Sequence, residues 1–309
     1  MKTKVFKTID EQINILQERG LTIDDIDFAK EELIRENYFF INGYRHLFLE
    51  NGSDKYYKEG TNFREIIALF NFDRQIRNIF FKNLLVVENN MKSIFSYQLS
   101  KEYGYREKDY LKNTNFNRSP EKQRQINDLL RKMKRQIRIN GGQHQATSHY
   151  IKNYGYIPLW VVVKVLSFGI VSELYTVMKE SDQEAIAQVY GVSSENLIRY
   201  LPILANYRNL CAHEDIVYNH KTNKVIEDNA IHAFLEIPIQ NGEYIYGKND
   251  IFAVLIIMKY LLREDDFRML MREVQYEVEK LDGIIDSIPV EKILDQMGLP
   301  SNYMELIDL

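Results

Sequence analysis

The amino-acid sequence predicts an all-α fold, on three observations. The 309 residues include only 14 Gly and 6 Pro, so turns are few and the elements between them must be long. From position 62 to about position 101 the chain has neither residue type, and its apolar side chains recur at three- and four-residue steps, which is the period of a helix. Hydrophobic residues make up 45% and charged residues 27% of the chain, a composition typical of a folded protein with a sizeable core.

The N-terminal region is predicted to form two helices followed by a turn. Residues 8–11 have the spacing of a helix capping box, and Gly20 is placed to end that first helix. Residues 22–25 repeat the start signal for a second helix that runs toward Glu36. The aromatic segment 38–44 is broken by an Asn-Gly pair, so we expect a turn packed on the core.

The central region is predicted to be helical apart from short connections. The stretch 62–101 forms either two helices or one long bent helix. The segment 159–168 is so apolar that its helix must be buried nearly all round, with Trp160 and Phe168 in the core. The other helices expected here are 120–139, which Pro120 begins, 181–190 and 193–203.

The C-terminal third begins with a gap in the helical pattern. Between about 219 and 248 two short apolar runs flank an Asn-Gly pair, which predicts a small hairpin or an ordered loop. No repeat, linker or domain boundary is evident, so we predict one domain, 1–309. Residues 1–55 form an appended N-terminal helical layer, and residues 56–309 form the helical core. The last expected helices are 250–262, 265–281 and 290–297.

Charge and cysteine content narrow the classes of function. A formal net charge of −4 excludes a uniformly polybasic nucleic-acid binder, although a local patch can still bind a phosphate backbone. The single cysteine, Cys211, excludes an internal disulfide and multi-cysteine zinc sites. No signal peptide is evident, and the two most apolar stretches are shorter than the roughly 20 residues of a membrane helix. We therefore expect a cytoplasmic protein that makes no membrane contact.

One short polar segment, 208–213, carries the residue types of phosphodiester chemistry. His213 can act as general acid or base near neutral pH, and Arg208 can hold a phosphate and stabilise its developing charge. Asn209 lies four residues before His213 and shares its helix face, so it can orient the imidazole or donate to phosphate. Arg208 lies about 140° away from His213 around an ideal helix.

That angle leaves several arrangements open. Arg208 reaches around the helix, the helix distorts, or two chains bring their segments into one composite site, which makes a symmetric homodimer attractive. An ordinary structural interpretation also exists, in which Arg208 pairs with Glu214 or Asp215 at the surface and His213 is a satisfied histidine. By spacing alone, an Arg-x4-His pair favours this interpretation.

Several ordered blocks, taken together, resemble one known family. The segment Arg208-Asn209-Leu210-Cys211-Ala212-His213 resembles its RN-x-x-AH block, and Pro158-Leu159-Trp160 followed by Leu166-Ser167-Phe168-Gly169 resembles its most recognisable block. The chain is similar over nearly its full length to the Abi-like (AbiD/AbiF) abortive-infection proteins of bacteria. The further matching blocks are 7–13, 38–44, Phe72-Asp73-Arg74-Gln75-Ile76-Arg77, Tyr218-Asn219, 246–250 and 297–300.

This resemblance implies a site and an activity. The Abi-like family is grouped with HEPN proteins, whose R-x4-6-H motif in many members forms a metal-independent endoribonuclease site at a dimer interface. It implies that Arg208 and His213 are catalytic, that Asn209 assists, and that no cofactor is needed. Some similar proteins act with a small non-coding RNA that restrains them. One departure is Lys164, which stands where the family often has an acid; another acid, Glu214 or Glu173, would then have to orient the histidine.

The implied reaction uses the chemistry of RNA itself. The 2′-OH attacks the adjacent phosphorus and leaves a 2′,3′-cyclic phosphate and a 5′-OH end, while His213 moves the proton and Arg208 stabilises the charge. The alternative is a non-catalytic RNA-binding HEPN module in a ribonucleoprotein, which Lys164 favours. A third hypothesis is a dimerisation protein with no RNA role, which would show no affinity for RNA even at low salt.

A second region is a candidate for gripping the RNA backbone. The stretch 118–138 carries eight basic residues against two acidic ones, although a solvated helix face is the ordinary explanation for such a run. Cys211 is interpreted as a packed side chain, and stacking of Tyr207 or Tyr218 on a base is left open. The candidate RNA-binding residues are Arg118, Lys122, Arg124, Arg131, Lys132, Lys134, Arg135 and Arg138.

Overall fold

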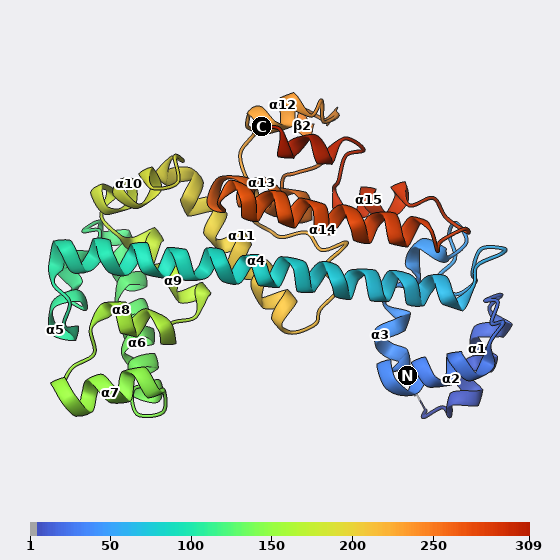
Figure 1. Ribbon diagram of the computed structural model, residues 1–309, viewed down its shortest axis with the longest axis horizontal. Helices are drawn as coiled ribbons and strands as arrows, with labels where there is room; N and C mark the ends of the chain where they lie inside the picture. The colour runs from blue at the N-terminus through green and yellow to red at the C-terminus, as the bar shows by residue number, and fades with distance from the viewer. Residues whose placement is uncertain (1–4) are drawn as a thin grey trace.

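A single long helix is the spine of the protein in the computed structural model, which describes residues 5–309 (Figure 1). Helix α4, Phe63–Tyr103, has 41 residues and therefore runs about 60 Å. Asn62 and Glu65 form a capping box at its start, which satisfies two of the free backbone amides there. Of the two arrangements predicted for this stretch, the single helix is the one observed.

The N-terminal residues form a small helical lobe beside the first turns of α4. The predicted capping box is present, because Thr8 accepts from the Glu11 amide and Glu11 accepts from the Thr8 amide. The prediction of a packed turn over 38–44 is confirmed only at its end, where Gly43 and Tyr44 form a turn and Tyr44 is buried. The residues before it form a short helix whose Phe39 and Phe40 are exposed. The lobe comprises α1 (Ile9–Glu18), α2 (Ile26–Glu36), α3 (Tyr38–Asn42) and η1 (Arg45–Phe48).

A second lobe lies at the other end of α4. The prediction of one buried helix over 159–168 was wrong, since the chain turns extended at Leu166 and Ser167 then caps the next helix. Trp160 was predicted in the core but is 48% exposed, whereas Phe168 is buried as predicted. The lobe comprises α5 (Glu107–Tyr110), η2 (Asn113–Asn115), η3 (Pro120–Lys122), α6 (Gln123–Asn140), α7 (Gln145–Tyr154), α8 (Leu159–Val162) and η4 (Val163–Val165).

The core lies where the remaining helices pack along α4. Helix α14 (Glu264–Asp282) lies along the spine, and α11 (Ser194–Ala212) packs against both α4 and α9 (Phe168–Val177). The predicted Asn-Gly hairpin exists as β1 (Ile239–Gln240) paired with β2 (Glu243–Tyr244). The other elements are α10 (Glu180–Gln188), α12 (Ala230–Phe234), α13 (Ile251–Leu261), α15 (Glu291–Met297) and η5 (Tyr303–Ile307).

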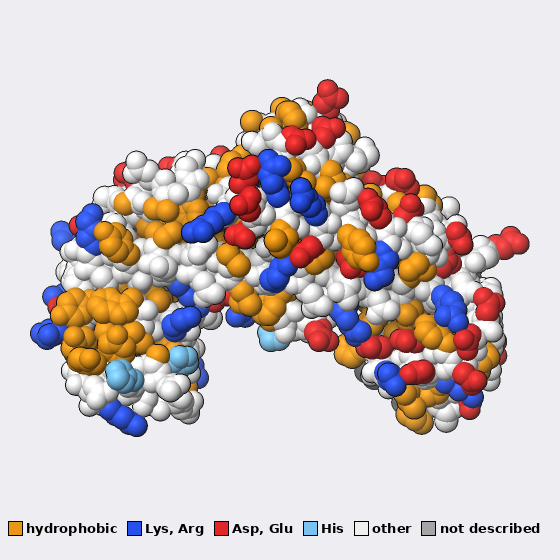
Figure 2. Space-filling view, in the orientation of Figure 1, with side chains coloured by type: hydrophobic (Ala, Val, Ile, Leu, Met, Phe, Trp, Pro, Cys, Tyr) orange, Lys and Arg blue, Asp and Glu red, His pale blue; other side chains and the backbone are white. Residues whose placement is uncertain are grey.

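The arrangement is an arch. The two lobes project from the same side of α4, and the C-terminal end of α11 emerges between them (Figure 1). The space-filling view shows this underside hollowed between the lobes (Figure 2). Within residues 5–309, every helix is too short or too polar to cross a bilayer.

Candidate functional site at the end of helix α11

The Arg-x4-His segment occupies the last turn of α11. Ser193 caps the start of this helix by accepting from the Asn196 amide. The helix was predicted to end at Ile203 but continues to Ala212, because buried side chains recur at helical spacing through Cys211. His213 is the C-terminal cap, and its backbone amide donates to the Asn209 carbonyl at 3.0 Å.

Arg208 faces the spine helix. Its Nε donates to Oε2 of Glu88 at 3.0 Å, and its guanidinium lies 5.8 Å from the ring centroid of Phe81. The other oxygen of Glu88 accepts from Lys92 Nζ at 2.6 Å. Glu88 is only 4% exposed and Lys92 is also buried, so one buried carboxylate holds two cations. The suggested surface pairing of Arg208 with Glu214 or Asp215 is not what the structure shows.

His213 faces a cleft. Its side chain is exposed, and no hydrogen bond to its ring is found within residues 5–309. The cleft has a volume of about 1020 Å³ and lies between the N-terminal lobe and the end of α11. Arg74 in this cleft is neutralised by a bidentate ion pair with Glu36, at 3.1 and 2.6 Å. The cleft is lined by residues of α2 and α3, by Phe70, Arg74 and Arg77 of α4, and by residues 212–216.

The loop after the motif is held by a buried carboxylate on α4. Asp73 accepts from the Tyr218 amide at 2.7 Å, from the Val217 amide at 3.2 Å and from the Tyr44 hydroxyl at 2.6 Å. Arg77, one turn along the helix, forms an ion pair with the same carboxylate. Burial raises the pKa of Asp73, and the Arg77 guanidinium acts against that rise. This network fixes where the chain goes after His213.

The two predicted catalytic residues thus have different surroundings. Arg208 contacts Glu88 and Phe81 on α4, whereas His213 lines the cleft, of whose wall Arg208 is not part. This separation agrees with the angle of about 140° expected for residues five apart on a helix. Asn209 is exposed one turn before His213, on the same helix face.

Neighbouring side chains that sequence reasoning left open are structural. Burial raises the pKa of the Cys211 thiol to about 12, so this thiol is a packed side chain and not a nucleophile. Tyr207 and Tyr218 are fully buried, which removes them as platforms for a base. Tyr207 donates its hydroxyl to the His220 carbonyl at 2.7 Å, and Tyr218 stacks on His46.

The basic stretch forms α6 and the turns before it, and it lies away from the motif. Helix α6 packs on α9, which in turn packs on α11. Some of its cations are engaged: Lys132 pairs with Glu173 at 2.7 Å, Arg131 pairs with Asp128, and Lys122 donates to the Thr176 carbonyl at 2.9 Å. Glu173 of α9 is therefore paired with Lys132 of α6 and is not the acid that orients His213. Of the basic residues in 118–138, those that are exposed and form no ion pair within residues 5–309 are Arg118, Arg124, Lys134, Arg135 and Arg138.

Two groups that matter for the site were not predicted from the sequence. Asp73 and Glu88 each lie among the buried positions of α4, four residues before a basic residue. An acid and a base four residues apart on an otherwise apolar helix face would have indicated a buried ion pair, because charged side chains are rarely buried unless they are paired. The partners of these carboxylates on and after α11 are more than 100 residues away in sequence.

The fold and the site define a helical protein with an Arg-x4-His segment at a helix end, clamped to a long spine helix. A family model described as Abi-like protein matches residues 31–219, which is more than half of the chain. The chain belongs to the Abi-like family, and this membership links it to abortive-infection defence. A search among curated proteins and a search among solved structures each found no match.

Proposed function

We propose that the protein is a metal-independent endoribonuclease of the HEPN type, acting in defence against phage, whose active site combines Arg208 of one protomer with His213 of its partner. The observation that carries the proposal is that one of these two side chains is held by a buried partner and the other is exposed. Arg208 is held in one orientation by Glu88, while the ring of His213 is exposed at the mouth of a cleft with both flanks of its backbone fixed. A histidine placed in this way is available to a group outside its own chain.

The chemistry follows from the residue types. His213 takes the proton of the ribose 2′-OH as that oxygen attacks the adjacent phosphorus, and the imidazolium returns this proton to the leaving 5′-oxygen. Arg208 stabilises the negative charge on the phosphoryl oxygens, and Asn209 donates to a non-bridging oxygen. The products are a 2′,3′-cyclic phosphate and a 5′-OH end, and DNA resists because it lacks the attacking hydroxyl. A small non-coding RNA is the regulatory partner that we expect to restrain the enzyme.

The first test is cleavage of short labelled RNA by the purified protein in excess chelator. We expect cyclic-phosphate ends, and no cleavage by Arg208→Ala or His213→Ala. Arg199→Ala is the matched control, since Arg199 lies on the same helix but is exposed and pairs with Glu227 at 2.6 Å. Cleavage that requires added metal, or that persists in either motif variant, would refute a metal-independent site made of Arg208 and His213.

Mixing the two inactive variants tests whether the site is shared between protomers. In a heterodimer of Arg208→Ala and His213→Ala, a shared arrangement leaves one of two sites with both residues intact. Free exchange of protomers should therefore restore about a quarter of the wild-type activity. If each site lies within one chain, the mixture stays inactive and the composite arrangement is wrong.

A non-catalytic RNA-binding module is the second candidate. It is favoured by Lys164, which is exposed on η4, and by the pairing of Arg208 with Glu88, which offsets the charge that a phosphate would otherwise meet. It predicts RNA binding without cleavage, unchanged in His213→Ala. Any inhibitory RNA has to be removed before this comparison, and the absence of nucleic acid is checked by the ratio of absorbance at 260 and 280 nm.

A further inference from the structure

Three aromatic rings, two of them exposed, form a cluster on the lobe at the C-terminal end of α4. The ring centroid of Tyr105 lies 5.5 Å from that of Trp160 and 5.9 Å from that of Tyr156. The guanidinium of Arg106 lies 4.8 Å from the Tyr156 ring centroid. Trp160 is 48% and Tyr105 is 39% exposed. We call Tyr105, Arg106, Tyr156 and Trp160 the aromatic platform; the space-filling view shows hydrophobic side chains gathered over this lobe (Figure 2).

The platform is held by the backbone beneath it. The Leu159 amide donates to the Tyr105 carbonyl at 3.1 Å, which ties the segment before α5 to the start of α8. Leu159 and Val161 on either side of Trp160 are buried, so the indole is anchored at its base while its ring remains accessible. Rings that are ordered before binding lose little conformational entropy when a flat partner stacks on them.

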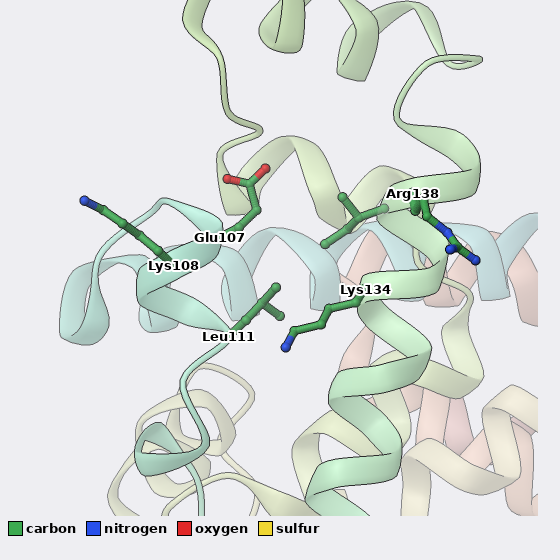
Figure 3. Close-up of a pocket in the computed structure, with 6 residues that line it drawn as sticks. Glu107, Lys108, Leu111, Lys134 and Arg138 are labelled. Atoms are coloured by element: carbon green, nitrogen blue, oxygen red, sulfur yellow. The ribbon is translucent and has the colours of Figure 1, made fainter.

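A basic groove begins at Glu107, the next residue along the chain after Arg106 of the platform. Residues 105 and 106 lead into α5, which faces α6 across a groove of about 510 Å³ (Figure 3). Lys108 comes from α5, and Lys134 and Arg138 come from α6. The single acid in the groove, Glu107, accepts from the Ile157 amide at 2.7 Å. The cations therefore outnumber the acids along a surface that begins with exposed aromatic rings.

We propose that this surface binds single-stranded RNA, with unpaired bases stacked on the aromatic platform and phosphates along the groove. Exposed aromatic rings next to cations suit unpaired bases, because every base has a flat face and the backbone beside it is anionic. A duplex keeps its bases stacked within itself and offers none to the rings. The proposal rests on the proposed function only in taking RNA as the ligand, and it makes no use of Arg208 or His213.

Trp160 is the sole tryptophan of the chain, so its fluorescence reports directly on the platform. The probe is an unstructured oligouridine of about twelve nucleotides, within the usual range of such sites, added to full-length His213→Ala protein so that it is not cut. We expect saturable quenching of Trp160 that weakens as salt rises. A blunt RNA duplex of equal length should quench far less, and equal quenching by the duplex would overturn the proposal.

Variants separate stacking from general attraction. Tyr105→Ala and Arg106→Ala, both at exposed positions, should each weaken the binding of oligouridine, the former roughly five- to a hundredfold. Tyr276→Ala is the matched control, because Tyr276 is an exposed tyrosine near Lys82 of α4, about 30 Å along that helix from its end. Equal affinities in Tyr105→Ala and Tyr276→Ala would overturn the proposal.

The outcome is distinguishable from that of the nuclease test. Quenching without any cleavage by the wild-type protein supports the platform and refutes the nuclease. Cleavage that depends on Arg208 and His213, with Trp160 emission unchanged by bound RNA, refutes the platform alone. Emission that changes with protein concentration and not with RNA would also refute it, and would assign the surface to a contact between protein molecules.

Discussion

The pairing of Glu88 with Arg208 yields a sharp prediction, because the same carboxylate serves stability and positioning. Glu88 is buried and accepts from both Arg208 and Lys92. Glu88→Gln keeps the shape but removes the negative charge, which leaves the buried ammonium of Lys92 without its counterion. Removing one partner of a buried ion pair costs about 3–5 kcal/mol, and the amide oxygen still accepts one hydrogen bond. We expect a loss of about 3 kcal/mol in the free energy of unfolding.

The double variant Glu88→Gln/Lys92→Met separates the two roles. Replacing the ammonium by an apolar side chain of similar length removes the unpaired buried charge, so most of the lost stability should return. The charge-assisted bond to Arg208 does not return, because the amide oxygen that remains opposite its Nε carries no negative charge and holds the guanidinium less firmly. A misplacement of about 1 Å can reduce a rate about a hundredfold, so RNA cleavage should stay roughly ten- to a hundredfold below wild type in both variants.

Urea denaturation and cleavage of labelled RNA measure these two effects on the same preparations. Lys92→Met alone is the control: it leaves Glu88 with Arg208, and its cleavage rate should remain close to wild type. Wild-type cleavage by Glu88→Gln would refute the positioning role of Glu88. Recovery of cleavage together with stability in the double variant would show that the carboxylate acts only through folding.

Three further outcomes are expected. Asp73→Asn should lower the free energy of unfolding by about 3 kcal/mol in urea, because a buried carboxylate that serves Arg77 and two loop amides is lost. Burial lowers the pKa of His232 below its usual 6.5, so its contribution to stability is present above pH 6.5 and is lost as pH falls through the folded pKa. His232→Gln should remove up to about 1.4 kcal/mol per pH unit from that dependence, measured by urea unfolding from pH 7 to pH 5. Replacing Lys134 and Arg138 by Gln should reduce the slope of log affinity against log salt for single-stranded RNA by about 1.4, and an unchanged slope would exclude both from phosphate contact.

Local signals in the sequence predicted the helices well. The capping box predicted at residues 8–11 is formed, since it depends on side chains three residues apart. The prediction of one helix over the apolar segment 159–168 was wrong because hydrophobic periodicity cannot distinguish a continuous helix from two short elements with a break. The backbone turns extended at Leu166, and Ser167 starts α9.

The candidate site was predictable only in part. Arg208 and His213 came from residue type and resemblance, and the structure places both at the end of α11. Spacing on the helix also predicted that they face different ways. The choice of Glu88 as the partner of Arg208 depends on how α11 crosses α4, and a tertiary contact between residues 120 positions apart has no local signal.

The part of the chain matched by the family model ends at residue 219, just after the second attachment of the motif to α4. The first attachment is Glu88 to Arg208, before His213, and the second is Asp73 to the amides of residues 217 and 218, after it. Two clamps from one rigid helix thus fix the backbone on both sides of a histidine whose own ring is exposed. A side chain needed only for folding would gain stability by being buried between the clamps. The fixed backbone and free ring instead suit a residue that acts on a group supplied from outside the chain, which is why we favour a site completed by a second protomer and its RNA.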